Sequence, residues 1–296
     1  MQTKQATSII FGITGQDGCF LTKLLEQKNV NVLGISRSKA AVTGDVADFE
    51  FVKELIIRIK PRLIFNFAAN STTRHDVLFE NHQTISTGAL NILEAVRLHS
   101  PTTKVFLSGS AMQFKNEGLP IDELTSFEAS SPYSIARIQS VYAARYYREK
   151  FGLNVYVGYF FNHDSPLRSE QHVNQKIVRA AQRIAAGSSE KLQLGNVDVK
   201  KEFSFAGDVV EAIWLLVNQD KVYEAIIGSG KTYSIREWLA YCFKKINLNY
   251  EDYIVTQNGF VAEYETLVSK PSVMLDLGWK AKVDFYQLAD MMMENK

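Results

Sequence analysis

Short apolar runs alternate with longer amphipathic stretches through the first half of the chain. The runs at 8–13, 30–35, 62–67, 104–108 and 154–161 are typical of buried strands. The stretches between them carry apolar residues at helical spacing and predict helices over these ranges: 19–27, 47–60, 87–98 and 132–150. Repeated strand–helix–strand order indicates a parallel sheet with helices on both faces. We therefore expect an α/β, doubly wound Rossmann fold.

The second half of the chain is less regular. Its apolar spacing predicts helices with short strands between them, at 173–187, 207–219, 234–247 and 285–294. We expect this half to form a smaller, substrate-binding lobe that is mostly C-terminal. The predicted Rossmann domain is 1–162 plus about 203–228, and the predicted lobe is about 163–202 and 229–296.

A glycine turn follows the first apolar run. Gly12, Gly15 and Gly18 are three residues apart and stand between the predicted strand and the predicted helix. Backbone N–H groups and the helix dipole at such a turn form a site for a pyrophosphate. We therefore assign the turn, including Gln16 and Asp17, to a dinucleotide. An ordinary turn between a strand and a helix is the alternative.

Composition and charge narrow the function. The 296 residues carry a net charge of +1 without a basic run, which argues against nucleic acid as a partner. Cys19 and Cys242 are the only cysteines, and the five histidines are scattered, so we expect neither a disulfide scaffold nor a metal site. No apolar segment reaches membrane-spanning length, and residues 1–6 lack the apolar run of a signal peptide. We expect a soluble cytoplasmic protein without a membrane partner.

The second predicted strand ends in a feature that bears on the choice of dinucleotide. Arg37 and Ser38 stand where NAD-binding folds carry a carboxylate for the ribose 2′-hydroxyl. An arginine accommodates a 2′-phosphate instead, so the sequence favours NADP, with NAD as the alternative. A solvated surface role for Arg37 also stays open. Further cofactor contacts are assigned to Asp45, Val46, Ala68 and Ala69.

A second group of polar residues lies at two other predicted element ends. Tyr133 and Arg137 are four residues apart at the start of a helix and so share one face. Ser110 follows the carboxyl end of a strand, where doubly wound sheets bind ligands. A tyrosine beside a fixed cation can act as an acid–base group, while a serine hydroxyl holds the substrate oxygen and a nicotinamide exchanges hydride. We predict Tyr133, Arg137 and Ser110 as catalytic residues, with Arg137 also reaching the cofactor.

With these residues in place, the chain resembles an extended short-chain dehydrogenase/reductase. More specifically, the segments 13–18, 160–166 and 194–201 resemble GDP-mannose 4,6-dehydratase, and Phe161-Asn-His-Asp-Ser-Pro166 is the most specific of these. The resemblance implies a GDP-linked sugar nucleotide held between two lobes, and a homo-oligomer (dimer or tetramer) formed through helices at 84–99 and 132–150. It also implies substrate contacts at Asn162, Val173, Lys176, Lys201, Arg236 and Lys270.

Three positions depart from the family pattern. Arg137 stands where the family has lysine, Ser110 where it has threonine, and Met112 where a dehydratase has its glutamate. The glutamate removes the C5 proton and protonates the leaving C6 hydroxyl, which a thioether cannot do. We therefore predict C4 hydride transfer on a GDP-mannose-type sugar without elimination, with Met112 contacting substrate. Asp122 or Glu123 remains an alternative source of the carboxyl group.

Three other functions stay open. One is a working GDP-mannose 4,6-dehydratase with a relocated acid–base group, and another is a nucleotide-sugar epimerase that reduces the ketone on its other face. The third is a catalytically weak relative that binds nucleotide. The mass of the product separates a dehydratase from a simple oxidoreductase.

Overall fold

The computed structural model describes residues 7–257 and 259–294. At its centre is a seven-stranded parallel sheet with the order β11-β6-β5-β4-β1-β2-β3. The strands are β1 (Thr7–Phe11), β2 (Asn31–Ser36), β3 (Val42–Thr43), β4 (Leu63–Asn66), β5 (Lys104–Ser110), β6 (Val155–Phe160) and β11 (Glu224–Ile227). The direction of winding reverses between β1 and β4, and ligands of such sheets bind at the carboxyl ends of the strands near this point.

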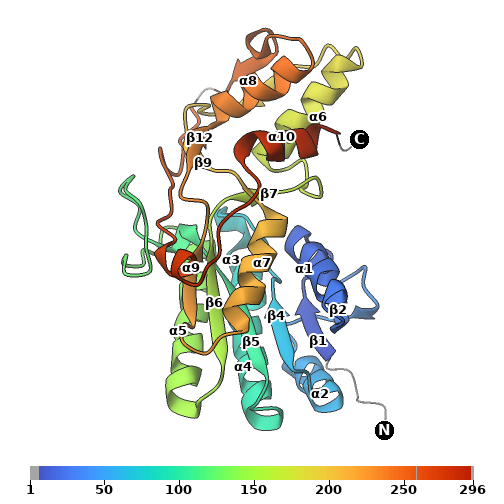
Figure 1. The fold of residues 1–296 in the computed structure, drawn as a ribbon, viewed down its shortest axis with the longest axis vertical. Coiled ribbons are helices and arrows are strands. Elements are labelled where there is room, and N and C mark those ends of the chain that lie inside the picture. Colours follow the sequence, from blue (N-terminus) through green and yellow to red (C-terminus); the bar gives the residue numbers. More distant parts are fainter. Residues whose placement is uncertain (1–6, 258, 295–296) are drawn as a thin grey trace.

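Helices cover both faces of this sheet (Figure 1). One layer holds α2 (Phe49–Ile59), α4 (Gly88–His99) and α5 (Pro132–Phe151), and the other holds α1 (Gln16–Gln27), α7 (Ala206–Val217) and α9 (Ser272–Asp276). Within β1, Ile9 and Phe11 pack against the first layer and Ile10 against the second. Burial on both faces explains why these strands read as continuous apolar runs.

A smaller lobe lies beyond the carboxyl ends of the strands, at the top of Figure 1. It contains α6 (Val173–Ala185), α8 (Ile235–Lys245), α10 (Phe285–Glu294) and the paired strands β8 (Leu192–Leu194) with β13 (Ile254–Thr256) and β9 (Lys200–Glu202) with β12 (Thr232–Ser234). The pair β7 (His163–Asp164) and β10 (Ser204–Phe205) lies where the chain passes between the lobes. The lobe has its own core, in which Trp238, Phe243 and Phe285 are buried.

The predicted fold class is confirmed, with differences in detail. The two-residue strand β3 is too short to give an apolar run. The helical segment that ends in α4 begins earlier than expected, with α3 (Leu78–Asn81) and a π-helical turn at 82–87. Residues 272–281, expected in the smaller lobe, return to the sheet, where Met274 and Trp279 pack with α7. The indole N–H of Trp279 donates to the Asp208 backbone carbonyl over 3.0 Å, and this bond holds residues 272–281 against α7.

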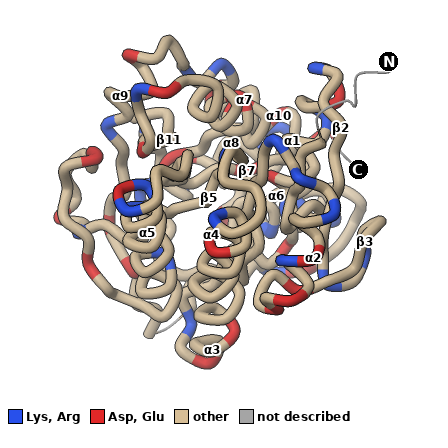
Figure 2. Tube along the Cα trace, turned by 90° about the horizontal axis from the view of Figure 1, so that it is seen from below, with Lys and Arg blue, Asp and Glu red and all other residues tan. Residues whose placement is uncertain are grey.

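The surface of the described residues carries charges of both signs. Lysine and arginine positions are interspersed with aspartate and glutamate along the chain (Figure 2). None of the helices in residues 7–257 and 259–294 is long and apolar enough to span a bilayer.

Candidate active site

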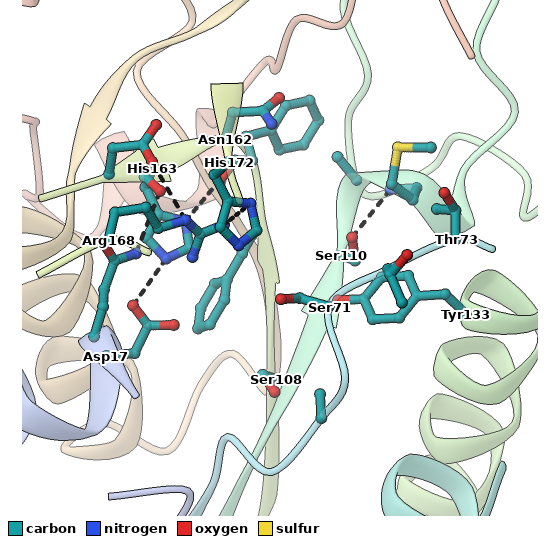
Figure 3. Close-up of a pocket in the computed structure, with 18 of the residues that line it drawn as sticks. Asp17, Ser71, Thr73, Ser108, Ser110, Tyr133, Asn162, His163, Arg168 and His172 are labelled. Carbon is teal, nitrogen blue, oxygen red and sulfur yellow. Dashed lines mark hydrogen bonds and ion pairs between the residues drawn. The ribbon is translucent and has the colours of Figure 1, made fainter. Parts of the chain in front are cut away.

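A cleft of about 460 Å³ opens between the carboxyl edge of the sheet and the smaller lobe. Both parts of the chain line it, and Figure 3 shows two groups of side chains on opposite sides. Asp17, His163, Arg168 and His172 form one group, and Ser110, Thr73 and Tyr133 form the other. The predicted site residues that line it are Gly12, Gly15, Gln16, Asp17, Gly18, Ala69, Ser110, Met112, Tyr133, Arg137, Asn162, Val173 and Lys201.

The glycine turn lines the cleft at the ends of β1 and α1. Gly12 has a φ of +82°, a conformation that favours glycine. A Cβ atom on Gly18 would lie 2.5 Å from the Gly12 carbonyl oxygen and 2.6 Å from the Ile13 Cα, both backbone atoms. Only glycine lets strand and helix approach so closely. The turn therefore leaves the α1 N-terminus open to an anion, as a cofactor pyrophosphate requires.

Gln16 and Asp17 of this turn are tied to the segment after β6. Asp17 forms an ion pair with His163, whose Nε2 lies 2.9 Å from Asp17 Oδ1, while Nδ1 lies 2.9 Å from the Phe161 carbonyl oxygen. Ser165 donates to Gln16 over 2.8 Å. Burial opposes both charged forms, but their mutual attraction prevails, so the pKa of His163 is raised and that of Asp17 is lowered. The pair thus joins the glycine turn to the segment after β6 on one side of the cleft.

Tyr133 is placed by a well-defined helix start. Ser131 caps α5 through a capping box with Ser134, and Pro132 occupies the first turn. Tyr133 is 9% exposed and packs with Ile85 and Met112. Its side chain lies on the same side of the cleft as Ser110 (Figure 3). The structure therefore brings the predicted acid–base tyrosine and the predicted hydroxyl together.

Arg137 lies one turn further along α5 and is anchored to the end of β5. Its Nη1 donates to the Ser108 hydroxyl over 2.8 Å and to the Ser108 carbonyl oxygen. The guanidinium carbon lies 5.0 Å from the centroid of the Tyr133 ring. Its Nε is buried without a hydrogen-bond partner. A fixed positive charge therefore lies against the tyrosine ring, and one donor on it remains available.

Met112 lines the same end of the cleft. Ser110 caps the 3₁₀ turn η3 (Ala111–Gln113) and accepts the Met112 N–H over 3.2 Å. The two carboxyl groups that could replace a glutamate at this position lie elsewhere. Asp122 pairs with Lys270 at 3.2 Å, Glu123 accepts the Ile226 N–H over 2.8 Å, and neither side chain lines the cleft.

The opposite end of the cleft is basic. Lys201, on β9, is 8% exposed, and its burial lowers the pKa of its amine, an effect that the charge of Asp164 opposes. Arg168 lies 3.3 Å from Asp164 and 3.2 Å from His172 Nδ1. Burial and the charge of Arg168 lower the pKa of His172 to about 4. Lys201 and Arg168 thus supply fixed positive charge beside the N-terminus of α6, a combination that suits a diphosphate.

Buried polar atoms at this end lack partners. The Asn162 Oδ1 and the Asn174 Oδ1 are buried without a hydrogen bond, although Asn174 donates to Asp164 over 2.6 Å. Burial, aided by the charge of Glu263, raises the pKa of Tyr264 to about 12, and the side chain of Asn162 opposes this shift. Unsatisfied buried acceptors are rare, so they mark places where a ligand would donate.

The sequence of this chain is similar to those of known proteins. The profile of the GDP-mannose 4,6 dehydratase family matches residues 38–292. GDP-mannose 4,6 dehydratase 1 of Arabidopsis thaliana is 33% identical, over 97% of this chain and 88% of its own length. The chain belongs to the GDP-mannose 4,6-dehydratase family. The predicted resemblance is therefore confirmed.

Solved structures support the fold. A dTDP-glucose 4,6-dehydratase from Bacillus anthracis in complex with NAD superposes with a TM-score of 0.87 at 17% identity, over 98% of this chain and 96% of its own. The RMD protein of Pseudomonas aeruginosa, complexed with NADPH, gives 0.86 at 19% identity, over 98% of both chains. At these identities the likeness establishes the Rossmann architecture.

Some predicted contacts of this family member lie outside the cleft. Arg37 pairs with Glu80 at 3.1 Å on the surface, and Asp45 accepts the Ala47 N–H over 2.9 Å. Lys176 donates to the Gln193 carbonyl over 2.7 Å, and Arg236 pairs with Asp198. The predicted residues that do not line the cleft are Arg37, Ser38, Asp45, Val46, Ala68, Lys176, Arg236 and Lys270.

The cleft also contains residues that the sequence analysis did not assign. Arg168 and His172 lie in the loop before α6 and line the cleft. This loop follows the segment 160–166, which carries the family resemblance, and that proximity is the sequence signal that could have identified them. Thr73, Glu263 and Tyr264 come from loops without a motif. Only their tertiary packing brings them to the site.

Proposed function

We propose that this protein is an NAD(P)-dependent oxidoreductase that transfers hydride at C4 of a GDP-linked, mannose-type sugar and leaves the C6 hydroxyl in place. The observation that carries the proposal is Met112, a thioether beside Ser110 and Tyr133 where a dehydratase needs a carboxyl group. Family membership supports a sugar nucleotide as substrate.

The glycine turn fits a dinucleotide. Gly12, Gly15 and Gly18 would hold its pyrophosphate at the N-terminus of α1, and Arg37 with Ser38 would face the adenosine ribose, where the arginine favours NADP and NAD remains an alternative. The superposed structures with NAD and NADPH agree with this use of the fold. When bound, the nicotinamide accepts or donates the hydride.

The residues at the sugar end then have separate tasks. The Tyr133 oxygen takes the proton of the C4 hydroxyl during oxidation and returns it during reduction. The Ser110 hydroxyl holds the same substrate oxygen in line with Tyr133. Arg137, fixed to Ser108 and lying against the Tyr133 ring, offsets the negative charge that develops on the tyrosine oxygen.

Elimination of water needs more than these three residues. A base must remove the C5 proton, and an acid must protonate the departing C6 hydroxyl. Of the acidic residues that line the cleft, Asp17 is paired with His163 and Asp164 with Arg168, both at the diphosphate end. Glu263 is exposed on a loop of the smaller lobe and accepts the Thr73 hydroxyl, and we assign it a role in binding rather than in proton transfer. With Met112 beside Ser110, the reaction stops at the exchange of one hydride and one proton.

The diphosphate of the substrate would bind at the basic end. Lys201 and Arg168 supply charge, Asn162 and Val173 line the same wall, and the buried Asn162 Oδ1 would accept a donor of the nucleotide. We propose no substrate role for Lys176, Arg236 or Lys270, because each head group is engaged outside the cleft.

Cofactor stoichiometry tests the proposal. A dehydratase returns its hydride to the sugar and leaves the cofactor unchanged, whereas a C4 dehydrogenase produces one reduced cofactor for each keto sugar. We expect incubation with GDP-mannose and excess NADP⁺ to accumulate NADPH, and a 4-keto sugar nucleotide to consume it. Product formation without any net change in cofactor would contradict the proposal. Tyr133→Phe should abolish either change.

A further inference from the structure

Glu263 connects the smaller lobe to the sugar end of the cleft. It lies between β13 and α9, whereas Thr73 lies in the loop after β4, 190 positions away in the sequence. The Thr73 hydroxyl donates to Glu263 Oε1, and both residues line the cleft together with Tyr133 and Met112. Figure 3 shows Thr73 on the same side as Tyr133 and Ser110. Glu263 therefore lies near the reacting part of the substrate.

The surroundings of Glu263 differ from those of the other cleft carboxyl groups. Asp17 and Asp164 are engaged by a histidine or an arginine, within a wall that is otherwise basic. Glu263 is exposed and its described partner is a neutral hydroxyl that supplies a single proton. Two carboxylate oxygens offer about four acceptor positions, so Glu263 can accept further hydrogen bonds besides the one from Thr73.

The backbone beside Glu263 is held in place. Tyr264 packs against the hydrophobic core of the first helical layer, and Leu267, three residues later, is 2% exposed. The Leu267 N–H donates to the Lys200 carbonyl over 2.9 Å, next to Lys201 on β9. The segment that carries Glu263 is thus fixed to the wall where the diphosphate would bind. A nucleotide held there would direct its sugar toward Tyr133 and past Glu263.

We propose that Glu263 accepts hydrogen bonds from two neighbouring hydroxyls of the substrate sugar and so selects a neutral hexose. The proposal rests on the sugar-nucleotide function proposed above. Adjacent hydroxyls can donate to the two oxygens of one carboxylate, and these bonds strengthen as the bound sugar excludes water. A sugar that carries its own carboxylate, such as a uronic acid, would be repelled by Glu263.

Binding of GDP and of GDP-mannose to Glu263→Gln tests the inference, because GDP has no sugar to contact. We expect the Kd of GDP-mannose to rise by about tenfold or more, as for a lost hydrogen bond to a charged group, and the Kd of GDP to stay unchanged. Glu265→Gln is the matched control, because Glu265 is exposed, lies two residues away and does not line the cleft. It should leave both values as in the wild type.

Sugar selectivity and turnover are two further measurements that test the inference. Wild-type protein should bind GDP-mannose more tightly than GDP-mannuronate, and Glu263→Gln should narrow that difference. In turnover, Glu263→Gln should raise KM and change kcat by less than about threefold. Unchanged GDP-mannose affinity, or a collapse of kcat at constant KM, would overturn the inference and leave the proposed C4 chemistry standing. A wild-type protein that binds neither GDP nor GDP-mannose would overturn both.

Discussion

Replacing Lys201 by methionine should separate the stability of the protein from its affinity for nucleotide. Lys201 is 8% exposed, lies 5.4 Å from the ring centroid of Phe203 and has its pKa lowered by burial. Because the folded state binds its proton less tightly than the unfolded chain, this lysine costs stability at neutral pH. That cost is relieved as the pH rises toward the ordinary pKa of 10.5. Lys201→Met should therefore unfold at an equal or higher urea concentration at neutral pH.

The affinity of Lys201→Met for nucleotide should fall, although its stability is equal or higher. A unit charge about 4 Å from a phosphate contributes about 4 kcal/mol at an effective dielectric constant of about 20, and desolvation reduces this gain. Measured hydrogen bonds to charged groups are worth about 1.5–3 kcal/mol, which corresponds to about 10- to 150-fold in Kd. We expect calorimetric titration with GDP to show a loss in this range for Lys201→Met. Lys201→Arg keeps the charge and should restore most of the affinity.

Lys176→Met provides the control, because Lys176 is also a predicted nucleotide residue but donates to the Gln193 carbonyl outside the cleft. It should bind GDP as the wild type does. Equal GDP affinity in Lys201→Met and the wild type would refute the assignment of the basic wall to the diphosphate. A large loss of affinity in Lys176→Met would refute it as well.

Three further substitutions have expected outcomes. Gly18→Ala places a methyl group 2.5 Å from the Gly12 carbonyl oxygen and should cost about 1–3 kcal/mol of unfolding free energy and abolish dinucleotide binding; a cofactor titration that matches the wild type would contradict the close approach. Arg37→Ala should weaken NADP by about tenfold and leave NAD unchanged, which paired titrations of both cofactors would check. Glu224 has a pKa lowered to about 2, since its bonds to Arg145, Tyr159 and Arg148 outweigh its burial. Its stabilising contribution is present above pH 4.5 and is lost as the pH falls toward 2. Glu224→Gln should therefore have a lower free energy of unfolding at pH 7, and this free energy should depend less on pH between 4.5 and 2.

The fold and part of the site follow from local features of the sequence. The glycine turn is a contiguous strand–turn–helix segment, and Tyr133 with Arg137 occupies one helical turn, so spacing alone relates these residues. The continuous apolar runs reflect strands buried on both faces. Sheet order and helix packing then bring Tyr133 and Ser110 to one end of the cleft, as the rule for the carboxyl ends of strands predicts.

The remaining parts of the site depend on contacts between distant segments. Whether a basic side chain faces the cleft depends on which residues it contacts in the folded chain. Lys201 is buried in the cleft whereas Arg236 pairs with Asp198, and the hydrophobic periodicity of the sequence does not distinguish the two. Arg37, in the loop after β2, meets Glu80 of α3, 43 positions away. Glu263 lies in an irregular loop, and only its contact with Thr73 reveals its position. Such pairings arise from packing and have no local pattern.

The mass of the product tests the central claim most directly. Purified protein would be incubated with GDP-mannose and NADP⁺ or NAD⁺, and the sugar nucleotide would be analysed by mass spectrometry. With Met112 beside Ser110 and Tyr133, we expect loss of two hydrogens, or their gain when a keto sugar is supplied with reduced cofactor. Loss of one water from GDP-mannose would contradict the account, because elimination would then proceed without a carboxyl group at position 112.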